Sequence, residues 1–377
     1  MSGILSPGRY ISERGAAGLA GTEVAAVGKS ALLVHGDVGY GLLKDELLAG
    51  LAAAGVSVTE ARHEGYCGEA TARRLADRGE AAGCDVVLAV GGGRVLDTGK
   101  SAADMLGAPC VLVPTSPSTC SAASAVVVDY TPDGTHIGGR MVRPSVASLV
   151  DPEFLARAPD RLLVSGIVDA LAKALEVRLG VGRIDGPGAE VVAAVTLSDD
   201  LERILMEHAV AAVAAGPEPL DAPVSAEADA GRTPRQLVAE ASLLWPGLIG
   251  SLAGERARLA AAHAMHNALT VLPGSHVSLH GELIAFGILV QLVLQDRADD
   301  ALAKTAAWFA DLGCPCDLEA LGCGAFLTDE ATRTQVLERA CAMVPMLATF
   351  PGIEPARLER AMRTADEVAL QAKLVRA

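Results

Sequence analysis

The chain has 377 residues, of which 51% are hydrophobic and 3% aromatic, and its formal net charge is −15. That length is sufficient for two domains with sizeable cores. The acidity and the scarcity of aromatic residues argue against nucleic acid as a partner, because neither phosphate contacts nor base stacking would be favoured. We interpret the acidity as a solubilising surface.

The predicted compartment is the cytoplasm. No apolar run reaches the roughly 18 residues needed to span a bilayer, so no membrane partner is expected. The N-terminus has no basic region followed by an apolar stretch, and no signal peptide is predicted. Most of the eight cysteines lie inside apolar segments, and Cys314-Pro315-Cys316 has no second pair that would indicate a zinc ribbon. Reduced thiols are therefore expected.

The first half alternates apolar strands with helical patterns. The strands are continuously apolar, as expected for parallel strands that helices cover on both faces. This alternation predicts a parallel α/β sheet, followed by a hairpin whose turn lies at residues 131–135. Strands are expected at residues 30–35, 56–60, 84–90, 110–114 and 124–130, and helices at about 41–54 and 69–82.

Three consecutive glycines, Gly91, Gly92 and Gly93, follow the third strand. Glycines let the backbone approach a phosphate closely, and the next helix would offer free N–H groups and the positive end of its dipole. The alternative is a tight turn between strand and helix, and a glycine triplet alone does not decide between the two. Asp97, early in that helix, favours the cofactor site.

Two more segments at strand ends have ligand-binding chemistry. Asp37 closes the first strand, where a carboxylate can accept hydrogen bonds from an adenosine ribose, which favours NAD over NADP. The alternative for Asp37 is a helix N-cap. The hydroxyl-rich run from Thr115 to Ser118 follows the fourth strand, where open α/β sheets bind ligands.

The second half is helical and contains a candidate metal site. Asp169 lies within an apolar helix, where a carboxylate is costly unless it is paired or metal-bound; an ion pair with Lys173 is the alternative. His263 and His266 share one face of a helix, and His280 follows a Pro-Gly break. Neutral imidazoles from two neighbouring elements suit a divalent metal, although satisfied or surface histidines remain an alternative.

Taken together, these motifs resemble the glycerol dehydrogenase-like branch of the metal-dependent (iron-type) alcohol dehydrogenase superfamily. The resemblance implies an α/β dinucleotide-binding domain over residues 1–155 and an all-α metal-binding domain over residues 156–377. It also implies an NAD-dependent oxidoreductase that acts on CH–OH donors as a homo-oligomer. The segments that carry it are residues 6–10, 91–100, 114–119, 166–172, 262–267 and 280–282.

The resemblance also implies roles for individual residues. Asp169, His263 and His280 match the metal ligands, and the first two are expected to contact substrate together with Cys120. His266 is similar to a histidine near the reacting carbon and is the expected catalytic residue. The expected cofactor contacts are Asp37, Gly91, Gly92, Gly93, Arg94, Val95, Asp97, Thr115, Ser116, Pro117, Ser118, Ser124, Val126 and Tyr130.

Two positions depart from the family pattern. Lys173 stands where the iron-dependent branch has a histidine, and three protein ligands suit catalytic zinc, with iron or another divalent metal as alternatives. Cys120 stands where glycerol dehydrogenases have an aspartate that contacts the polyol. A similar Ser-Thr-Cys run is found in hydroxycarboxylate dehydrogenases, and loss of an acidic group favours an anionic substrate.

The expected activity is thus oxidation of a small secondary alcohol, either a polyol or a 2-hydroxy acid, or reduction of the matching 2-oxo acid. One alternative is a dehydroquinate synthase-like lyase that uses NAD and zinc. Another is a catalytically degenerate nucleotide-binding protein. The sequence leaves open the exact substrate, the choice of zinc or iron and of NAD or NADP, the oligomer number and the physiological direction.

Overall fold

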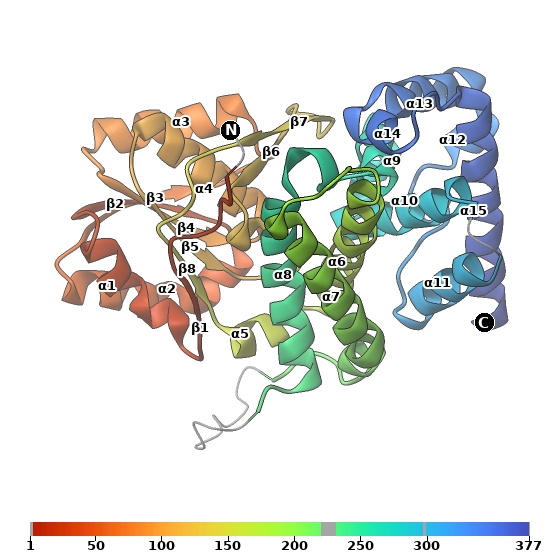
Figure 1. The fold of residues 1–377 in the computed structure, drawn as a ribbon. Coiled ribbons are helices and arrows are strands. Elements are labelled where there is room, and N and C mark those ends of the chain that lie inside the picture. The colour runs from red at the N-terminus through yellow and green to blue at the C-terminus, as the bar shows by residue number, and fades with distance from the viewer. Residues whose placement is uncertain (1–2, 220–230, 297–298, 377) are drawn as a thin grey trace. The chain divides into compact units, whose positions relative to one another are not determined.

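The computed structural model describes residues 3–219, 231–296 and 299–376 (Figure 1). By their internal contacts, these residues form two compact units. One consists mainly of Val164–Ala214 and Ile249–Ala377, and the other of Ile4–Leu163 and Ala215–Leu248. The first unit is helical and the second contains the sheets, so the predicted fold class is confirmed.

The second unit is built on a six-stranded sheet with the order β1-β8-β5-β4-β2-β3. Every neighbouring pair of strands in it is parallel, as the continuous apolar runs predicted. The central strands β4 and β5 are buried at every residue. The strands are β1 (Tyr10–Ser12), β2 (Ser30–His35), β3 (Ser57–Arg62), β4 (Val86–Gly91), β5 (Cys110–Pro114) and β8 (Ala147–Val150).

Helices cover both faces of this sheet (Figure 1). The chain runs outward from β2 to β3 and then returns past β2 to β4, so right-handed crossovers place α2 and α3 on opposite faces. The same reversal creates a topological switch point between β2 and β4, where ligands bind in open α/β sheets. The helices of this part are α1 (Ala20–Ala25), α2 (Val38–Ala53), α3 (Glu69–Ala81) and α4 (Gly93–Leu106), preceded by η1 (Ala16–Leu19).

The predicted hairpin is a separate antiparallel pair of strands. It consists of β6 (Val126–Tyr130) and β7 (His136–Met141), preceded by the short η2 (Ser121–Ala123). After β8 the chain enters α5 (Pro152–Ala156), which Asp151 caps by accepting the N–H of Phe154 at 3.1 Å.

The helical unit contains the longest and most apolar helices. Helix α10 (His280–Leu294) begins at the predicted histidine and is buried along almost its whole length. The other helices are α6 (Asp160–Val181), α7 (Ala189–Ala214), α9 (Ala261–Leu269), α11 (Asp299–Asp311), α12 (Ala325–Thr328), α13 (Glu330–Ala342), α14 (Val344–Thr349) and α15 (Pro355–Arg376), with η3 (Pro273–Val277) before α10. Helix α8 (Pro234–Ala257) is divided between the units, because its residues up to Leu248 belong to the sheet-containing one.

Helix α8 corrects one expectation from the sequence. By length and mean hydropathy it could cross a membrane, whereas no such segment was expected. Polar residues are scattered along α8, so the sequence shows no unbroken apolar run there. Its mean hydropathy nevertheless reaches the level of a membrane-spanning helix. Half of its apolar window is buried within the protein, Pro246 lies inside it, and the backbone leaves the helical conformation at Gly254.

Candidate functional site

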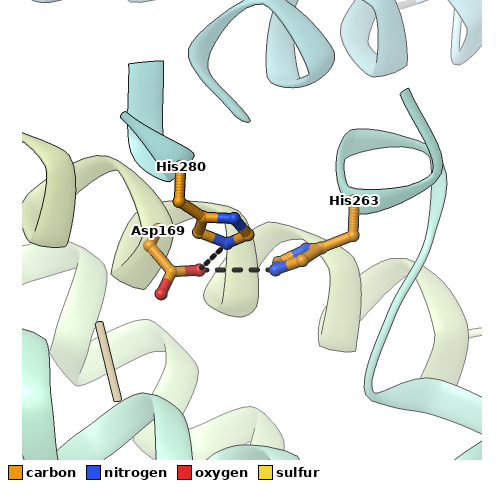
Figure 2. Close-up of side chains that lie close together, drawn as sticks. All are labelled: Asp169, His263 and His280. Carbon is orange, nitrogen blue, oxygen red and sulfur yellow. Dashed lines mark ion pairs between the residues drawn. The ribbon is translucent and has the colours of Figure 1, made fainter. Parts of the chain in front are cut away.

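Helices α6, α9 and α10 bring Asp169, His263 and His280 together (Figure 2). Oδ1 of Asp169 lies 3.3 Å from Nε2 of His263 and 3.5 Å from Nε2 of His280. All three potential ligand atoms lie within 4.8 Å of one another. Asp169 and His263 are buried, whereas the His280 side chain is 25% exposed. The three predicted ligands therefore converge on one point.

This geometry fits a tetrahedral divalent metal. Ligand distances of about 2.0–2.2 Å to zinc place neighbouring ligand atoms about 3.3–3.6 Å apart, which matches both carboxylate–imidazole distances. Lys173 supplies no fourth ligand, because its ammonium donates to the carbonyl oxygen of Arg258 at 2.9 Å. Among the described residues no ion pair joins Lys173 to Asp169, so the alternative explanation for this buried carboxylate does not hold.

The electrostatic interactions within the triad favour the binding of a cation there. Burial alone would raise the pKa of Asp169, but hydrogen bonds from His263 and His280 outweigh burial and lower it. Burial alone would lower the pKa of His263, but the carboxylates of Glu176 and Asp169 outweigh it and raise that pKa. The site thus attracts positive charge, which protons or a divalent metal ion can supply.

One face of α6 holds the starts of α9 and α10. The Oγ of Ser165 accepts the N–H of Gly281 at 3.1 Å, next to His280. Three turns further along α6, Oε1 of Glu176 accepts the N–H groups of Ala260 and His263 at 2.8 and 2.9 Å. Oε2 of Glu176 lies 2.5 Å from Nδ1 of His263.

Sequence analysis missed Glu176. The signal was present, because this glutamate lies seven residues after Asp169 and hence on nearly the same helix face. It also interrupts an apolar pattern, where a carboxylate needs a partner.

His266 lies beside a ligand and has partners on both ring nitrogens. Its Nε2 lies 2.9 Å from Nδ1 of His280, and its Nδ1 lies 2.8 Å from Oδ1 of Asn267. If His280 binds a metal through Nε2, its Nδ1–H donates to His266, and His266 in turn donates to Asn267. The contacts of His266 are therefore those of a residue that orients His280.

The predicted cofactor residues of the second unit gather at the carboxyl ends of β2, β4 and β5. Gly91 ends β4, and Gly92 precedes α4, whose first turn has no acidic residue. An added Cβ on Gly93 would lie 2.5 Å from Oγ1 of Thr119, and one on Gly92 would lie 3.2 Å from Oγ of Ser116. This glycine cradle, residues 91–93, has no side chain that would keep a dinucleotide phosphate from the N–H groups at the start of α4.

Asp37 follows β2, and its carboxylate faces the guanidinium of Arg62 at the end of the neighbouring strand β3. Nε of Arg62 donates to Oδ1 of Asp37 at 2.7 Å, and a second guanidinium nitrogen donates to Oδ2 at 2.6 Å. The hydrogen bonds from Arg62 lower the pKa of Asp37, so this carboxylate is ionised at neutral pH. Because each carboxylate oxygen can accept a second hydrogen bond, ribose hydroxyls can still bind Asp37.

Asp97 and Lys100 are buried in α4 and bind the segment after β5. The ammonium of Lys100 lies 2.9 Å from Oδ1 of Asp97 and donates to the carbonyl oxygens of Ser121, Ser124 and Val126 at 2.8–3.0 Å. The Oγ of Ser121 also donates to Asp97, whose Oδ2 accepts the N–H of Val128. Both side chains therefore shape the segment that contains the predicted contacts Ser124 and Val126.

Other predicted cofactor and substrate residues lie in the same unit. The N–H of Thr115 donates to the carbonyl of Gly91 at 3.0 Å. The guanidinium of Arg94 lies 4.1 Å from the centre of the Tyr66 ring, which in turn lies 5.7 Å from the Tyr130 ring. The remaining positions are Val95, buried in α4; Pro117 and Ser118, between β5 and η2; and Cys120, which is partly buried and precedes η2.

Comparisons with known proteins identify the family of this chain. The family model for iron-containing alcohol dehydrogenase matches residues 7–152. The chain is 31% identical over 372 residues to a glycerol dehydrogenase of Escherichia coli O6:H1, covering 97% of this chain and 96% of the relative. It is 32% identical over 266 residues to hydroxycarboxylate dehydrogenase A of Escherichia coli K12, covering 68% of each. The crystal structure of a probable glycerol dehydrogenase from Sinorhizobium meliloti 1021 superposes with a TM-score of 0.83 at 29% identity, covering 98% of this chain and 99% of that one.

The chain therefore belongs to the iron-containing alcohol dehydrogenase family, and its relatives lie in the glycerol dehydrogenase-like branch. It is an oxidoreductase that acts on CH–OH groups of small molecules, which confirms the predicted enzyme class. Membership in this family implies NAD(H) and a divalent metal, and the glycine cradle and the Asp–His–His triad fit both groups.

Proposed function

We propose that this protein is a zinc-dependent, NAD-linked dehydrogenase that interconverts a small secondary alcohol and its carbonyl compound. The observation that carries the proposal is the triad of Asp169, His263 and His280, which would supply three ligands to a metal, the number that catalytic zinc sites use when they keep a position for substrate. In this proposal residues 1–155 bind the dinucleotide and residues 156–377 hold the metal. We also propose that the protein is a homo-oligomer in the cytoplasm. All eight cysteines are described and none of them forms a disulfide, which supports a reducing compartment.

The roles of the residues follow from their contacts. When bound, the metal supplies a Lewis acid that lowers the pKa of the alcohol, and NAD supplies the hydride acceptor. Asp169 and His263, both buried, would hold the metal and would thereby fix where the oxygen of the substrate binds beside them. His266 was expected to be catalytic; we propose instead that it orients His280, because both its ring nitrogens already have partners.

The proposed substrate class is a 2-hydroxy acid and its 2-oxo acid. Two features support it: Cys120 in place of the aspartate of glycerol dehydrogenases, and the similarity to hydroxycarboxylate dehydrogenase A. A thiol cannot provide the acceptor oxygens that a carboxylate offers to a polyol. It also adds no negative charge to repel an anionic substrate.

The test is NAD(H)-linked turnover by the zinc-loaded enzyme, with oxidation of glycerol compared with reduction of a panel of 2-oxo acids. We expect kcat/KM for the best 2-oxo acid to exceed that for glycerol by about tenfold or more, or about 1.4 kcal/mol. Higher kcat/KM for glycerol would overturn the substrate class but not the reaction. Full turnover after complete metal removal would overturn the metal-dependent reaction itself.

A further inference from the structure

Glu176 is a fully buried carboxylate that belongs to no predicted site. It lies on α6, and its three hydrogen-bond partners belong to the start of α9. Buried carboxylates are retained only where their hydrogen bonds compensate for the loss of hydration. Each of its oxygens has a different task.

Oε1 of Glu176 caps helix α9 from outside. The N-cap residue of α9 is Ala260, whose side chain cannot accept a hydrogen bond. Oε1 accepts the N–H groups of Ala260 and His263, and Oε1 of Gln291 on α10 accepts the N–H of Ala262 at 3.2 Å. The first turn of α9 is therefore held by side chains of α6 and α10.

Oε2 of Glu176 faces the His263 ring. It lies 2.5 Å from Nδ1, while Nε2 of the same ring lies 3.3 Å from Oδ1 of Asp169. We propose that Glu176 is a positioning residue that keeps the ring proton of His263 on Nδ1 and thereby leaves the Nε2 lone pair for a metal. This inference rests on the metal site of the proposed function.

The physical basis is the single proton of a neutral imidazole. A carboxylate is only an acceptor, so Nδ1 must donate to it, and Nε2 is then the unprotonated nitrogen. Ligating histidines commonly donate their second N–H in this way, which fixes the tautomer and the ring orientation. The contacts of Oε1 with the backbone of α9 prevent Glu176 from turning away from the ring.

Glu176→Gln separates the two tasks of this side chain. In the variant, the side-chain amide oxygen can still accept the N–H groups of Ala260 and His263. The amide NH₂ group cannot take that position, because it would place a donor against those two N–H donors. The oxygen therefore stays with the backbone, and the NH₂ group points at Nδ1 of His263. Nδ1 must then accept, which moves the ring proton to Nε2 and blocks the metal position.

The experiment measures zinc content and zinc Kd by competition with a chromophoric chelator, together with the Tm of the metal-free proteins. The matched control is Asp366→Asn, which also neutralises a buried carboxylate that accepts a backbone N–H, that of Leu318 at 2.7 Å. We expect Glu176→Gln to bind zinc about 10–100-fold more weakly than wild type. The control should keep the wild-type Kd, and both metal-free variants should melt cooperatively.

The possible outcomes separate this inference from the proposed function. If Glu176→Gln folds and binds zinc as tightly as wild type, the inference is wrong. If wild type itself binds no divalent metal, the proposed function fails first. If Glu176→Gln does not fold, Glu176→Asp, which keeps the charge but is one methylene shorter, is expected to bind zinc more weakly; wild-type affinity in Glu176→Asp would equally overturn the inference.

Discussion

The backbone of Gly281 packs directly against the backbone of Ser165. A Cβ added to Gly281 would lie only 2.0 Å from the carbonyl oxygen of Ser165, while the Oγ of Ser165 accepts the Gly281 N–H at 3.1 Å. The start of α10, and with it His280, is thus positioned by direct contact with α6. No larger residue fits at position 281 without displacing one of the two helices.

Gly281→Ala should therefore weaken both folding and metal binding. We expect a loss of about 1–3 kcal/mol in the free energy of unfolding, because the neighbour is backbone and cannot rotate away. Zinc affinity should fall as well, since His280 moves with the helix start. Gly41→Ala is the matched control: this helical glycine in α2 has no atom within 4 Å of an added Cβ, so the substitution should be neutral or slightly stabilising. Unfolding in urea and zinc titration measure both effects, and equal stability of the two variants would contradict the prediction.

Stabilisation by zinc should increase as pH rises above neutrality. In the metal-free protein the pKa of His263 is raised above its ordinary 6.5, so its protonated form stabilises the fold below pH 6.5. This contribution is lost as pH rises through the folded-state pKa, which leaves the buried carboxylate of Asp169 without its cationic partner. Bound zinc would replace that partner.

The measurement is the difference in Tm between zinc-loaded and EDTA-treated protein from about pH 6 to pH 9. Asp169→Asn is the control, because removal of the carboxylate should abolish most of the difference at every pH. A difference that shrinks as pH rises would contradict the assigned protonation of the triad.

Asp37 and Arg62 together should determine the choice between NAD and NADP. Asp37→Ala removes the carboxylate that would repel a 2′-phosphate and releases the Arg62 guanidinium to bind that phosphate. We expect the ratio of kcat/KM for NADP to that for NAD to rise by about tenfold or more. The double variant Asp37→Ala with Arg62→Ala should lose most of this gain. Direct binding of NADP and NAD provides a second readout, and an unchanged ratio would exclude Asp37 from the ribose site.

Lys100→Met should weaken NAD binding without changing zinc affinity. The substitution leaves Asp97 buried beside three carbonyl groups that have lost their donor, and removal of one partner from a buried pair costs about 3–5 kcal/mol. The segment from Ser121 to Val126 should become loose, which raises the Kd for NAD. Lys304→Met, at an exposed pair with Asp300, is the control and should affect neither Kd nor stability. Unchanged NAD affinity in a folded Lys100→Met variant would contradict a role in shaping the cofactor segment.

Much of the sheet was predictable because its chemistry is local. Strands β2, β4 and β5 are buried on both faces, so their apolar runs stand out, and glycines mark where β4 ends. Strand β1 was not predicted, because Tyr10–Ser12 is only three residues long and partly buried. It becomes a strand only through parallel pairing with β8, which lies more than a hundred residues later in the chain.

The candidate site was predictable to the extent that unusual residue types reveal it. Histidines and a lone carboxylate in apolar helices are rare enough to point to Asp169, His263 and His280, and the structure brings them together. The partnership of Asp37 with Arg62 depends instead on the register of β2 against β3. The contact of His266 with His280 depends on how α9 and α10 pack. Such relationships are tertiary, and no local pattern contains them.

Lys100 makes its hydrogen bonds to carbonyl oxygens of the main chain, and Asp97 adds the N–H of Val128. Every residue has a backbone carbonyl and every residue except proline has a backbone N–H, so most side chains between Ser121 and Val126, apart from the Ser121 hydroxyl that donates to Asp97, can change during evolution while the path of the chain is retained. Substitutions in this segment can thus change its ligand specificity without changing its backbone conformation. In a family whose members act on different alcohols, such a separation of backbone shape from side-chain identity would let specificity diverge by single substitutions.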